Sequence, residues 1–389
     1  MLARDHSLNL TPASVDDYRE RARRRLPRQL FDYLDGGAFA EVTLRRNRED
    51  LEAIAFRQRV LRDVAERRLA TRVLGQDLAL PVILAPVGFA GMFAPRAEVL
   101  AARAAQAVGV PFVESTLSIC SLEEVARAVR APWFQLYVMK DRHVAEGLME
   151  RATTAGCPTL VLTVDLPVVG QRYRDARNGV GARVGRLGTL RRGLDVARHG
   201  RWVRDVALRG RPLSFGNLTA VLPDARVPSD FQHWVAGQFD PTVTWEDLDW
   251  VRRHWPGQVV IKGILDPDDA RRARDAGVDG VIVSNHGGRQ LDGVPSTIRA
   301  LPAIATAVGD DIDVLMDGGV RSGLDVAKAL ALGARACLVG RAWAYAVAAD
   351  GERGVRRVLE IMREEMRVTL GLTGVNDVAD LTADALVDA

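Results

Sequence analysis

The stretch GVIVSNHGG, residues 280–288, places a short run of apolar and small residues directly before a turn that holds a histidine and two glycines. The run is rich in β-branched residues and too short for a helix, which is typical of a buried strand. Strands buried on both faces belong to parallel sheets covered by helices. The stretch therefore predicts a parallel α/β protein with His286 at the carboxyl end of one strand.

Seven further runs of the same kind occur along the chain, each ending in a polar or glycine-containing turn. The eight runs cover residues 80–86, 110–116, 133–138, 159–165, 259–264, 280–285, 313–319 and 336–341. Alanine-rich segments with helical periodicity separate most of them, at 96–109, 121–129, 266–277 and 323–333. Eight strands that alternate with helices predict closure into a (β/α)8 TIM barrel. No low-complexity linker divides the 389 residues, so we expect a single domain over 1–389.

Two segments lie outside this regular alternation. Residues 14–34 predict one helix before the first strand, ended by Asp35-Gly36-Gly37. Strand centres are spaced by about 20 to 35 residues, but nearly 100 residues separate the fourth from the fifth. An insertion after a strand, here at about residues 176–240, is expected on the C-terminal face of a barrel, where active sites lie.

The composition, 48% hydrophobic and 26% charged, is that of a globular protein. No run of about 18 apolar residues occurs and the N-terminus has no apolar core, so the chain encodes no spanning helix or signal peptide and we expect a cytoplasmic location. Cys120, Cys157 and Cys337 lie far apart without a C-x-x-C pair, which argues against disulfides and a zinc site. We expect small core residues and no metal.

Charge is concentrated in the insertion. Residues 183–211 hold nine arginines and two aspartates, which give this segment a net charge of +7. The whole chain has a net charge of +3, so the rest of it carries −4. One interpretation is a solvated lid without a partner. The other, which we favour, is a basic segment that lies on anionic lipid, because apolar residues are interleaved with the arginines: Leu190, Leu194, Trp202, Val203, Val206 and Leu208. No recognition motif accompanies the charge, so nucleic acid is not expected as a partner.

The strand ends supply an acid–base pair. Among six histidines only His286 terminates a predicted strand, and Asp165, at the end of the fourth, should face it across the barrel. A lone histidine is often a structural hydrogen-bonding residue, but a carboxylate orients an imidazole and stabilises its protonated form. Gly287 and Gly288 allow backbone to approach a planar ligand, and Arg289 offers a fork for a carboxylate. The pattern predicts a general base beside a carboxylate-bearing substrate.

The last two strands predict a phosphate site. MDGGVRSG (316–323) and LVGRA (338–342) are glycine-rich turns that open helices after strands seven and eight, where barrels bind phosphate, although each alone could be a tight loop. Lys262 lies in the middle of strand five, where an unpaired cation would be costly, so we expect it to meet an anionic or electron-rich group. Flavin mononucleotide (FMN) would satisfy both features.

These motifs also resemble a known family. SNHGGRQLDG, FDYLDGGA, WFQLYVMKDR, TVDLPVVGQRYRDARNG, VIKGILDPDDA and DGGVRSGLDVAKALALGA are similar to the FMN-dependent enzymes that oxidise 2-hydroxy acids, over about residues 14 to 385. Within that family the chain most resembles the membrane-associated, L-lactate-oxidising branch. The resemblance implies FMN as cofactor, oxidation of an L-2-hydroxy acid, L-lactate to pyruvate first of all, and a homotetramer. An (S)-mandelate dehydrogenase or an oxygen-using oxidase is the alternative.

The resemblance also implies roles for individual residues. His286 would act on the α-carbon proton or the hydroxyl of the substrate with Asp165 as its partner, and the substrate would be bound by Arg172, Arg289, Tyr33 and Tyr137. Without the resemblance, the sequence does not decide whether Arg172 or Arg174 binds the substrate carboxylate, and it favours a packing role for Tyr33 at the end of its helix. Lys262 would stabilise negative charge on the reduced flavin. The other cofactor-binding residues implied are Pro86, Val87, Gly88, Ser115, Gln135, Thr163, Ser284, Asp317, Gly318, Gly319, Arg321, Gly340 and Arg341.

Three further expectations concern specificity and the electron acceptor. Phe89, Leu117, Met139 and Val169 are expected to shape the side-chain pocket. No haem-binding domain precedes residue 14, so we expect an outside acceptor, a membrane quinone, a cytochrome or oxygen, and a peripheral location on the inner face of the cell membrane. Gly88, where many oxidases have alanine, favours a dehydrogenase, whereas Glu114 stands where an apolar strand residue was expected and has no assigned role.

Overall fold

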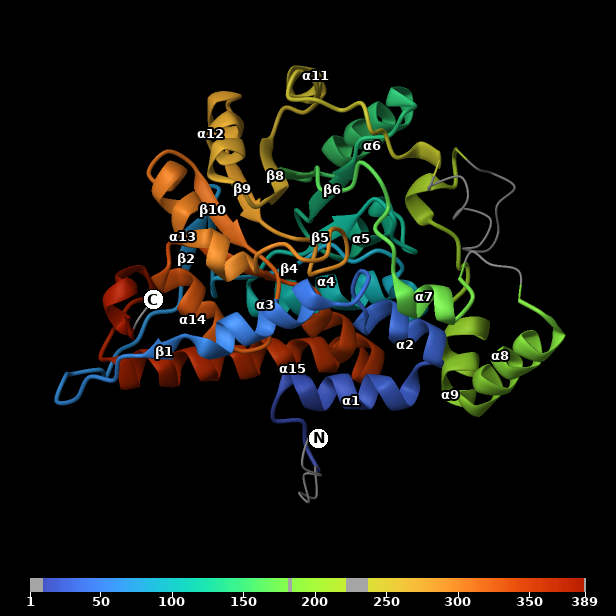
Figure 1. Cartoon of the computed structure of the whole chain (residues 1–389), viewed down its shortest axis with the longest axis horizontal. Helices are drawn as coiled ribbons and strands as arrows, with labels where there is room; N and C mark the ends of the chain where they lie inside the picture. Colours follow the sequence, from blue (N-terminus) through green and yellow to red (C-terminus); the bar gives the residue numbers. More distant parts are fainter. Residues whose placement is uncertain (1–9, 181–183, 222–236, 388–389) are drawn as a thin grey trace.

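The computed structural model describes residues 10–180, 184–221 and 237–387, and its centre is a parallel eight-stranded barrel (Figure 1). The strands are hydrogen-bonded in the order β4-β11-β10-β9-β8-β7-β6-β5. Their bounds are Val82–Leu84 (β4), Val113–Ser115 (β5), Trp133–Tyr137 (β6), Thr159–Thr163 (β7), Gln258–Ile264 (β8), Gly280–Val283 (β9), Asp313–Met316 (β10) and Ala336–Val339 (β11). A parallel bridge between Leu84 and Phe112 joins the two ends of this order. The predicted TIM barrel is confirmed, and each strand lies within one residue of its predicted run.

Helices cover the outside of the barrel. Their bounds are Ala97–Val108 (α4), Leu122–Ala128 (α5), Arg142–Thr154 (α6), Asp247–His254 (α11), Pro267–Asp275 (α12), Thr297–Val308 (α13), Gly323–Ala331 (α14) and Arg341–Thr373 (α15). Several begin at a side chain that accepts a hydrogen bond from the first turn, as Ser121 does for α5 and Ser322 for α14. The long helix α15 changes direction at Gly351, which has a φ of 62°. It runs beneath the barrel in Figure 1.

A short hairpin closes the N-terminal end of the barrel and was not predicted from the sequence. It consists of β2 (Thr71–Val73) and β3 (Gln76–Leu78). Val73, Leu74 and Leu78 join the apolar layer inside the barrel, made of Ile83, Ala85, Val113, Trp133, Val161, Val260, Ile282, Leu315, Ala336 and Leu338. This end is thus filled by side chains, and a ligand can enter only from the carboxyl ends of the strands.

The N-terminal segment corrects one prediction. Instead of one helix over 14–34, the chain forms α1 (Val15–Arg25) and α2 (Arg28–Asp35), separated at Leu26 and Pro27. A proline disfavours helical backbone in the residue before it, and Leu26 is extended with φ −88° and ψ 139°. Helix α2 ends at Asp35, as expected, and α3 (Val42–Ala53) follows. The break turns α2 across the open end of the barrel, so that it carries Tyr33 to the cavity.

The insertion lies beside α2. Helix α7 (Tyr173–Arg177) leads into it, and α8 (Arg186–Arg198) and α9 (Gly200–Trp202) lie within it, at the lower right in Figure 1. The Asp195 carboxylate accepts a hydrogen bond of 2.8 Å from the backbone N–H of Arg28, which joins α8 to the start of α2. Of the nine arginines in the basic stretch, Arg183 lies outside the described residues, as does part of the predicted insertion, residues 222–236.

Candidate active site

His286 and Asp165 meet at the open end of the barrel, as the sequence predicts. They follow β9 and β7, and the Nδ1 atom of His286 lies 2.9 Å from Oδ1 of Asp165. His286 has left-handed backbone, with φ 56°, and its N–H donates to Oγ of Ser284. Asp165 lies against Gly263 of β8, where a Cβ atom would come within 2.6 Å of the aspartate Cβ. Only glycine at residue 263 leaves room for this carboxylate.

Asp165 is mostly buried, with 11% of its side chain exposed, and its neighbours favour the ionised form. Burial alone would raise the pKa of Asp165. The interactions of its carboxylate with His286 and Lys262 outweigh burial, so the pKa lies below its usual value. An ionised carboxylate accepts the proton on Nδ1, which leaves Nε2 of a neutral imidazole as the proton acceptor. The arrangement fits a general base.

Two arginines lie over the ring of Tyr33. The guanidinium carbon of Arg289 is 4.8 Å from the ring centroid and that of Arg172 is 5.2 Å from it. Burial, and then the charge of Arg172, lower the pKa of Arg289, so two half-buried like charges are held near each other. Arg172 also pairs with Asp175 at 3.2 Å, which offsets part of this repulsion. An anion such as a carboxylate would relieve that repulsion. Arg174 instead pairs with Asp35 at 2.8 Å and Glu41 at 2.6 Å, which supports Arg172 as the arginine that faces the cavity.

Tyr137 completes the group of polar residues. It lies at the end of β6, with its ring 5.5 Å from that of Phe239 in an edge-to-face contact. Burial, followed by the charge of Asp165, raises the pKa of the Tyr137 hydroxyl, which therefore stays protonated and can donate a hydrogen bond. Tyr137, Tyr33 and His286 line one cavity.

Lys262 has partners within the protein. Its Nζ atom lies 3.0 Å from Oδ2 of Asp317 and donates to Oγ of Ser284 at 2.7 Å. Burial lowers the pKa of Lys262, but Asp317 and Asp165 raise it above its usual value, so the cation persists. The sequence assigned Asp317 to the phosphate. Here its carboxylate pairs with Lys262, so a contact of residue 317 with phosphate would have to come from its backbone, and the assignment stays a prediction.

Several buried polar atoms have no partner among the described residues, two of them in residues that line the cavity, Thr163 and Arg321, and one in Gln135, which bonds to the cavity-lining Ser115. These three atoms are Nε2 of Gln135, Oγ1 of Thr163 and Nε of Arg321. Ser115 donates to the Gln135 oxygen at 3.1 Å and holds the amide in place. Buried donors without partners are rare in native proteins, so their presence beside a cavity indicates a bound polar ligand. A flavin ring at Gln135 and Thr163, with its phosphate at Arg321, fits this set of donors.

The glycine-rich turns offer space for that ligand. Gly318 and Gly319 have φ values of 94° and 87°, in the left-handed region, and both line the cavity with Gly340. Pro86, Val87 and Gly88 line it from the end of β4. Backbone N–H groups in such turns and at the start of α15 suit a phosphate.

Arg341 has a structural task that the sequence did not predict. Its guanidinium donates to three backbone carbonyl oxygens, those of Leu34, Gly36 and Gly287. Burial is the main reason that its pKa falls to about 9. Arg341 thus holds the end of α2 against the turn after β9, and only its remaining N–H groups are free for the predicted phosphate contact.

The cavity has a volume of about 830 Å³ and extends beyond the strand ends. Phe89, Leu117 and Val169 line it as expected, but Met139 does not: it is buried, its backbone pairs with Phe239, and Phe239 lines the cavity instead. Sequence reasoning also missed a wall formed by α2, the turn after β4 and the insertion. Its residues are Leu30, Met92, Phe93, Arg192, Val196 and Trp202. No local pattern marks them, because they come from three separate segments.

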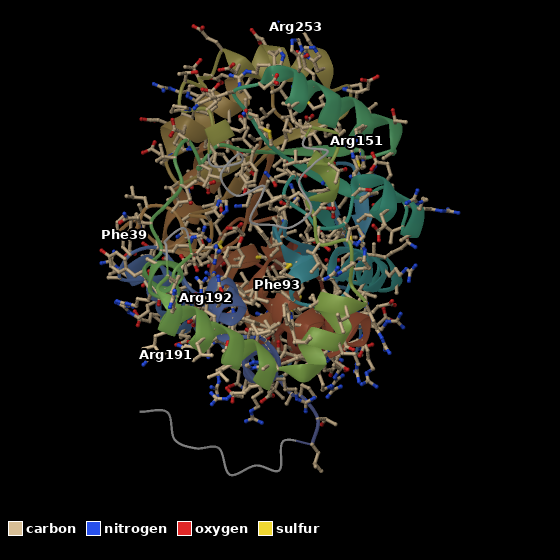
Figure 2. The ribbon with its side chains drawn as sticks, turned by 90° about the vertical axis from the view of Figure 1, so that its right-hand side faces the viewer. Phe39, Phe93, Arg151, Arg191, Arg192 and Arg253 are labelled. Carbon is tan, nitrogen blue, oxygen red and sulfur yellow. The ribbon has the colours of Figure 1, made fainter. Side chains whose placement is uncertain are left out.

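Helix α8 turns two of its polar side chains, Arg192 and Asp195, towards the protein. Arg192 donates to the carbonyl oxygen of Asn178 and Asp195 contacts Arg28, whereas Leu187, Leu190 and Leu194 are 62%, 59% and 50% exposed. Figure 2 looks onto this side of the molecule and labels Arg191 and Arg192 on the helix. Within the described residues, no helix is both long enough and apolar enough to cross a membrane.

Comparisons with known proteins give a consistent result. A family model described as FMN-dependent dehydrogenase matches residues 22–388. L-lactate dehydrogenase of Azorhizobium caulinodans is 54% identical over 376 residues, covering 96% of this chain and 98% of that protein. L-lactate dehydrogenase of Pseudomonas aeruginosa is 54% identical over 372 residues, 95% and 97% of the two chains.

Solved structures agree on the fold. The crystal structure of the monotopic membrane protein (S)-mandelate dehydrogenase has a TM-score of 0.91 at 38% identity and covers 97% of this chain and 100% of that one. A mandelate oxidase structure has a TM-score of 0.81 at 42% identity and covers 97% and 98%.

Proposed function

The chain belongs to the FMN-dependent dehydrogenase family, and we propose that it is an FMN-dependent L-lactate dehydrogenase that converts L-lactate to pyruvate. One observation carries the proposal: the His286–Asp165 pair, at 2.9 Å, lies in the same cavity as two arginines over Tyr33. A base beside a carboxylate-binding pair is what removal of hydrogen from a 2-hydroxy acid requires.

The residues that would hold FMN are those with unused polar groups. Gln135 and Thr163 would bind the ring edge, Lys262 would stabilise negative charge on the ring, and Arg321 with the glycine turns would hold the phosphate. Bound FMN supplies a two-electron acceptor for the substrate.

The chain itself orients the substrate and moves one proton. Arg172 and Arg289 would bind the substrate carboxylate, and the protonated Tyr137 hydroxyl would bind the substrate hydroxyl. His286 would accept a substrate proton at Nε2, and the Asp165 carboxylate at Nδ1 would stabilise the imidazolium that forms. The pair serves equally for a proton on the α-carbon or on the hydroxyl.

A second candidate function is oxidation of (S)-mandelate. The solved structures that resemble this chain are mandelate enzymes, but at 38% and 42% identity, against 54% for the L-lactate dehydrogenases. Lactate has only a methyl group to place among Phe89, Leu117 and Val169. We therefore rank L-lactate first.

We further propose that the enzyme attaches peripherally to the inner face of the cell membrane through α8 and passes electrons to a quinone. Helix α8 directs leucines outward, together with Arg186, Arg191 and Arg198, for which the described residues provide no ion pair. Exposed leucines beside unpaired arginines suit an anionic lipid surface. The homotetramer stays a prediction from the family resemblance.

Anaerobic flavin reduction tests the substrate. The purified yellow protein is mixed with L-lactate, glycolate or (S)-mandelate, and absorbance is followed near ~450 nm, where flavins absorb. L-lactate should bleach the flavin fastest. Bleaching by none of the three would contradict the enzymatic proposal, and rapid recolouring in air would indicate an oxidase.

Vesicle flotation tests the membrane proposal. The protein should float with anionic vesicles, and a Leu190→Gln/Leu194→Gln variant should not. Equal flotation of both proteins would exclude α8 as the attachment surface.

A further inference from the structure

The cavity contains an apolar arm that the reaction with lactate does not use. The arm begins at Tyr33, whose ring lies 6.4 Å from that of Phe93, and is lined by residues of α2, the turn after β4 and the insertion. Its wall comes from Leu30, Met92, Phe93, Val196 and Trp202. A lactate molecule whose carboxylate lies at Arg172 and Arg289 makes no contact with the residues of this arm.

The polar atoms around the arm already have partners. The indole N–H of Trp202 donates to the carbonyl oxygen of Met92 at 2.8 Å, so its ring can meet a ligand without an unsatisfied donor. Arg192 donates to Asn178, and Asp195 accepts from Arg28. The wall is therefore suited to an apolar, planar ligand and offers little to an ion.

The arm also reaches the surface that we propose to meet lipid. Val196 lines it and belongs to α8, the helix that exposes Leu187, Leu190 and Leu194. Trp202, in α9, forms the adjoining wall. A lipophilic molecule that passes from the bilayer boundary to Tyr33 meets these apolar side chains, beside Arg192 and Asp195, whose polar groups are bonded within the protein. A cytochrome, by contrast, is too large to enter and would have to dock outside.

We infer that this arm is the binding site for the ring of a membrane quinone. Its lining residues are Leu30, Met92, Phe93, Val196 and Trp202. The inference rests on the proposed function. L-lactate gives up two electrons and two protons on becoming pyruvate, and the quinone takes up two electrons and two protons to become a quinol, so no other reductant or oxidant is needed. Entry from the α8 side brings the quinone ring towards the flavin-binding end of the cavity.

Two variants, Leu30→Gln and Met92→Gln, test the site in the holoenzyme. Each makes one wall of the arm polar, away from the substrate-binding groups. With ubiquinone carrying one isoprenoid unit, in detergent, kcat/KM for the quinone should fall at least ~10-fold, a loss of about 1.4 kcal/mol. Anaerobic flavin reduction by L-lactate, and turnover with ferricyanide, should change less than ~2-fold. The matched control is Leu372→Gln on α15, an exposed leucine outside this cavity, which should leave all three rates unchanged.

Photolabelling gives a readout that does not depend on turnover. An azido derivative of the same quinone, irradiated with the oxidised holoenzyme, should label peptides from residues 27–34, 89–93 or 192–202, and Leu30→Gln should reduce that labelling. Labelling elsewhere would overturn the inference. Unchanged quinone kinetics in both variants would also overturn it. If the variants instead lost flavin reduction by (S)-mandelate and kept their quinone kinetics, the arm would be a pocket for larger substrates. If L-lactate fails to bleach the wild-type flavin, the proposed function fails while the labelling result stands.

Discussion

Asp165→Asn is the change that most directly tests the proposed chemistry. The substitution keeps the shape of the side chain and removes its charge, 2.9 Å from Nδ1 of His286. Two unit charges at that distance attract by about 6 kcal/mol at an effective dielectric constant of ~20. Lys262 already neutralises part of the aspartate charge. We therefore expect the barrier to rise by about 3–5 kcal/mol, which slows flavin reduction ~10²–10⁴-fold.

The assay is anaerobic stopped-flow reduction of the bound flavin by L-lactate, repeated across a range of pH. Residue 165 should keep its position, because Gln290 donates to its backbone carbonyl oxygen and Gly263 leaves the space for its side chain. The visible spectrum and melting temperature of Asp165→Asn should therefore stay close to wild type. A changed pH profile with an intact flavin spectrum separates a role in catalysis from a role in folding.

Asp313→Asn is the matched control. Asp313 lies at the other end of the barrel, where its carboxylate accepts a hydrogen bond of 2.6 Å from the backbone N–H of Leu74. This variant should lower stability with little effect on flavin reduction. If Asp165→Asn reduced its flavin as fast as wild type, Asp165 would not assist His286, and the proposed acid–base pair would be wrong.

Three other variants follow from the geometry. His286→Ala should abolish bleaching by L-lactate but keep the yellow colour in the purified protein; loss of bound FMN would show that His286 holds the cofactor instead. Gly263→Ala should slow flavin reduction at least ~10-fold, because the new Cβ would lie 2.6 Å from that of Asp165 at a φ of 116°; an unchanged rate would mean that the carboxylate can move freely. Burial, followed by the charge of Glu98, raises the pKa of Glu114, so the unfolded chain ionises first and wild-type stability is lost as pH rises above ~4.5. Glu114→Gln lacks this loss and should gain stability relative to wild type by up to about 1.4 kcal/mol per pH unit, measured by urea unfolding at pH 5 and pH 8; an equal difference at both pH values would contradict a neutral Glu114.

Local patterns were enough to predict much of the fold and the site. Strand runs, alanine-rich helices and glycine turns each depend on residues close in sequence, so the barrel and the strand-end positions of His286 and Asp165 could be predicted. The parallel barrel does the rest, because it brings all strand ends to one face. The break at Pro27 has a local signal too, and the prediction of one helix there overlooked it.

Other features depend on contacts between distant segments. The sequence does not show that Arg174 pairs with Asp35 and leaves Arg172 to the cavity, or that Asp317 pairs with Lys262. The sequence does not show that Arg192 and Asp195 of α8 contact Asn178 and Arg28, while the leucines of the helix point outward. The sequence by itself determined which residues stand at strand ends, because that depends on local backbone preferences. Only the tertiary structure decided which of them pair, because hydrogen bonds and charge pairs form over a few ångströms in space, whatever the separation along the chain.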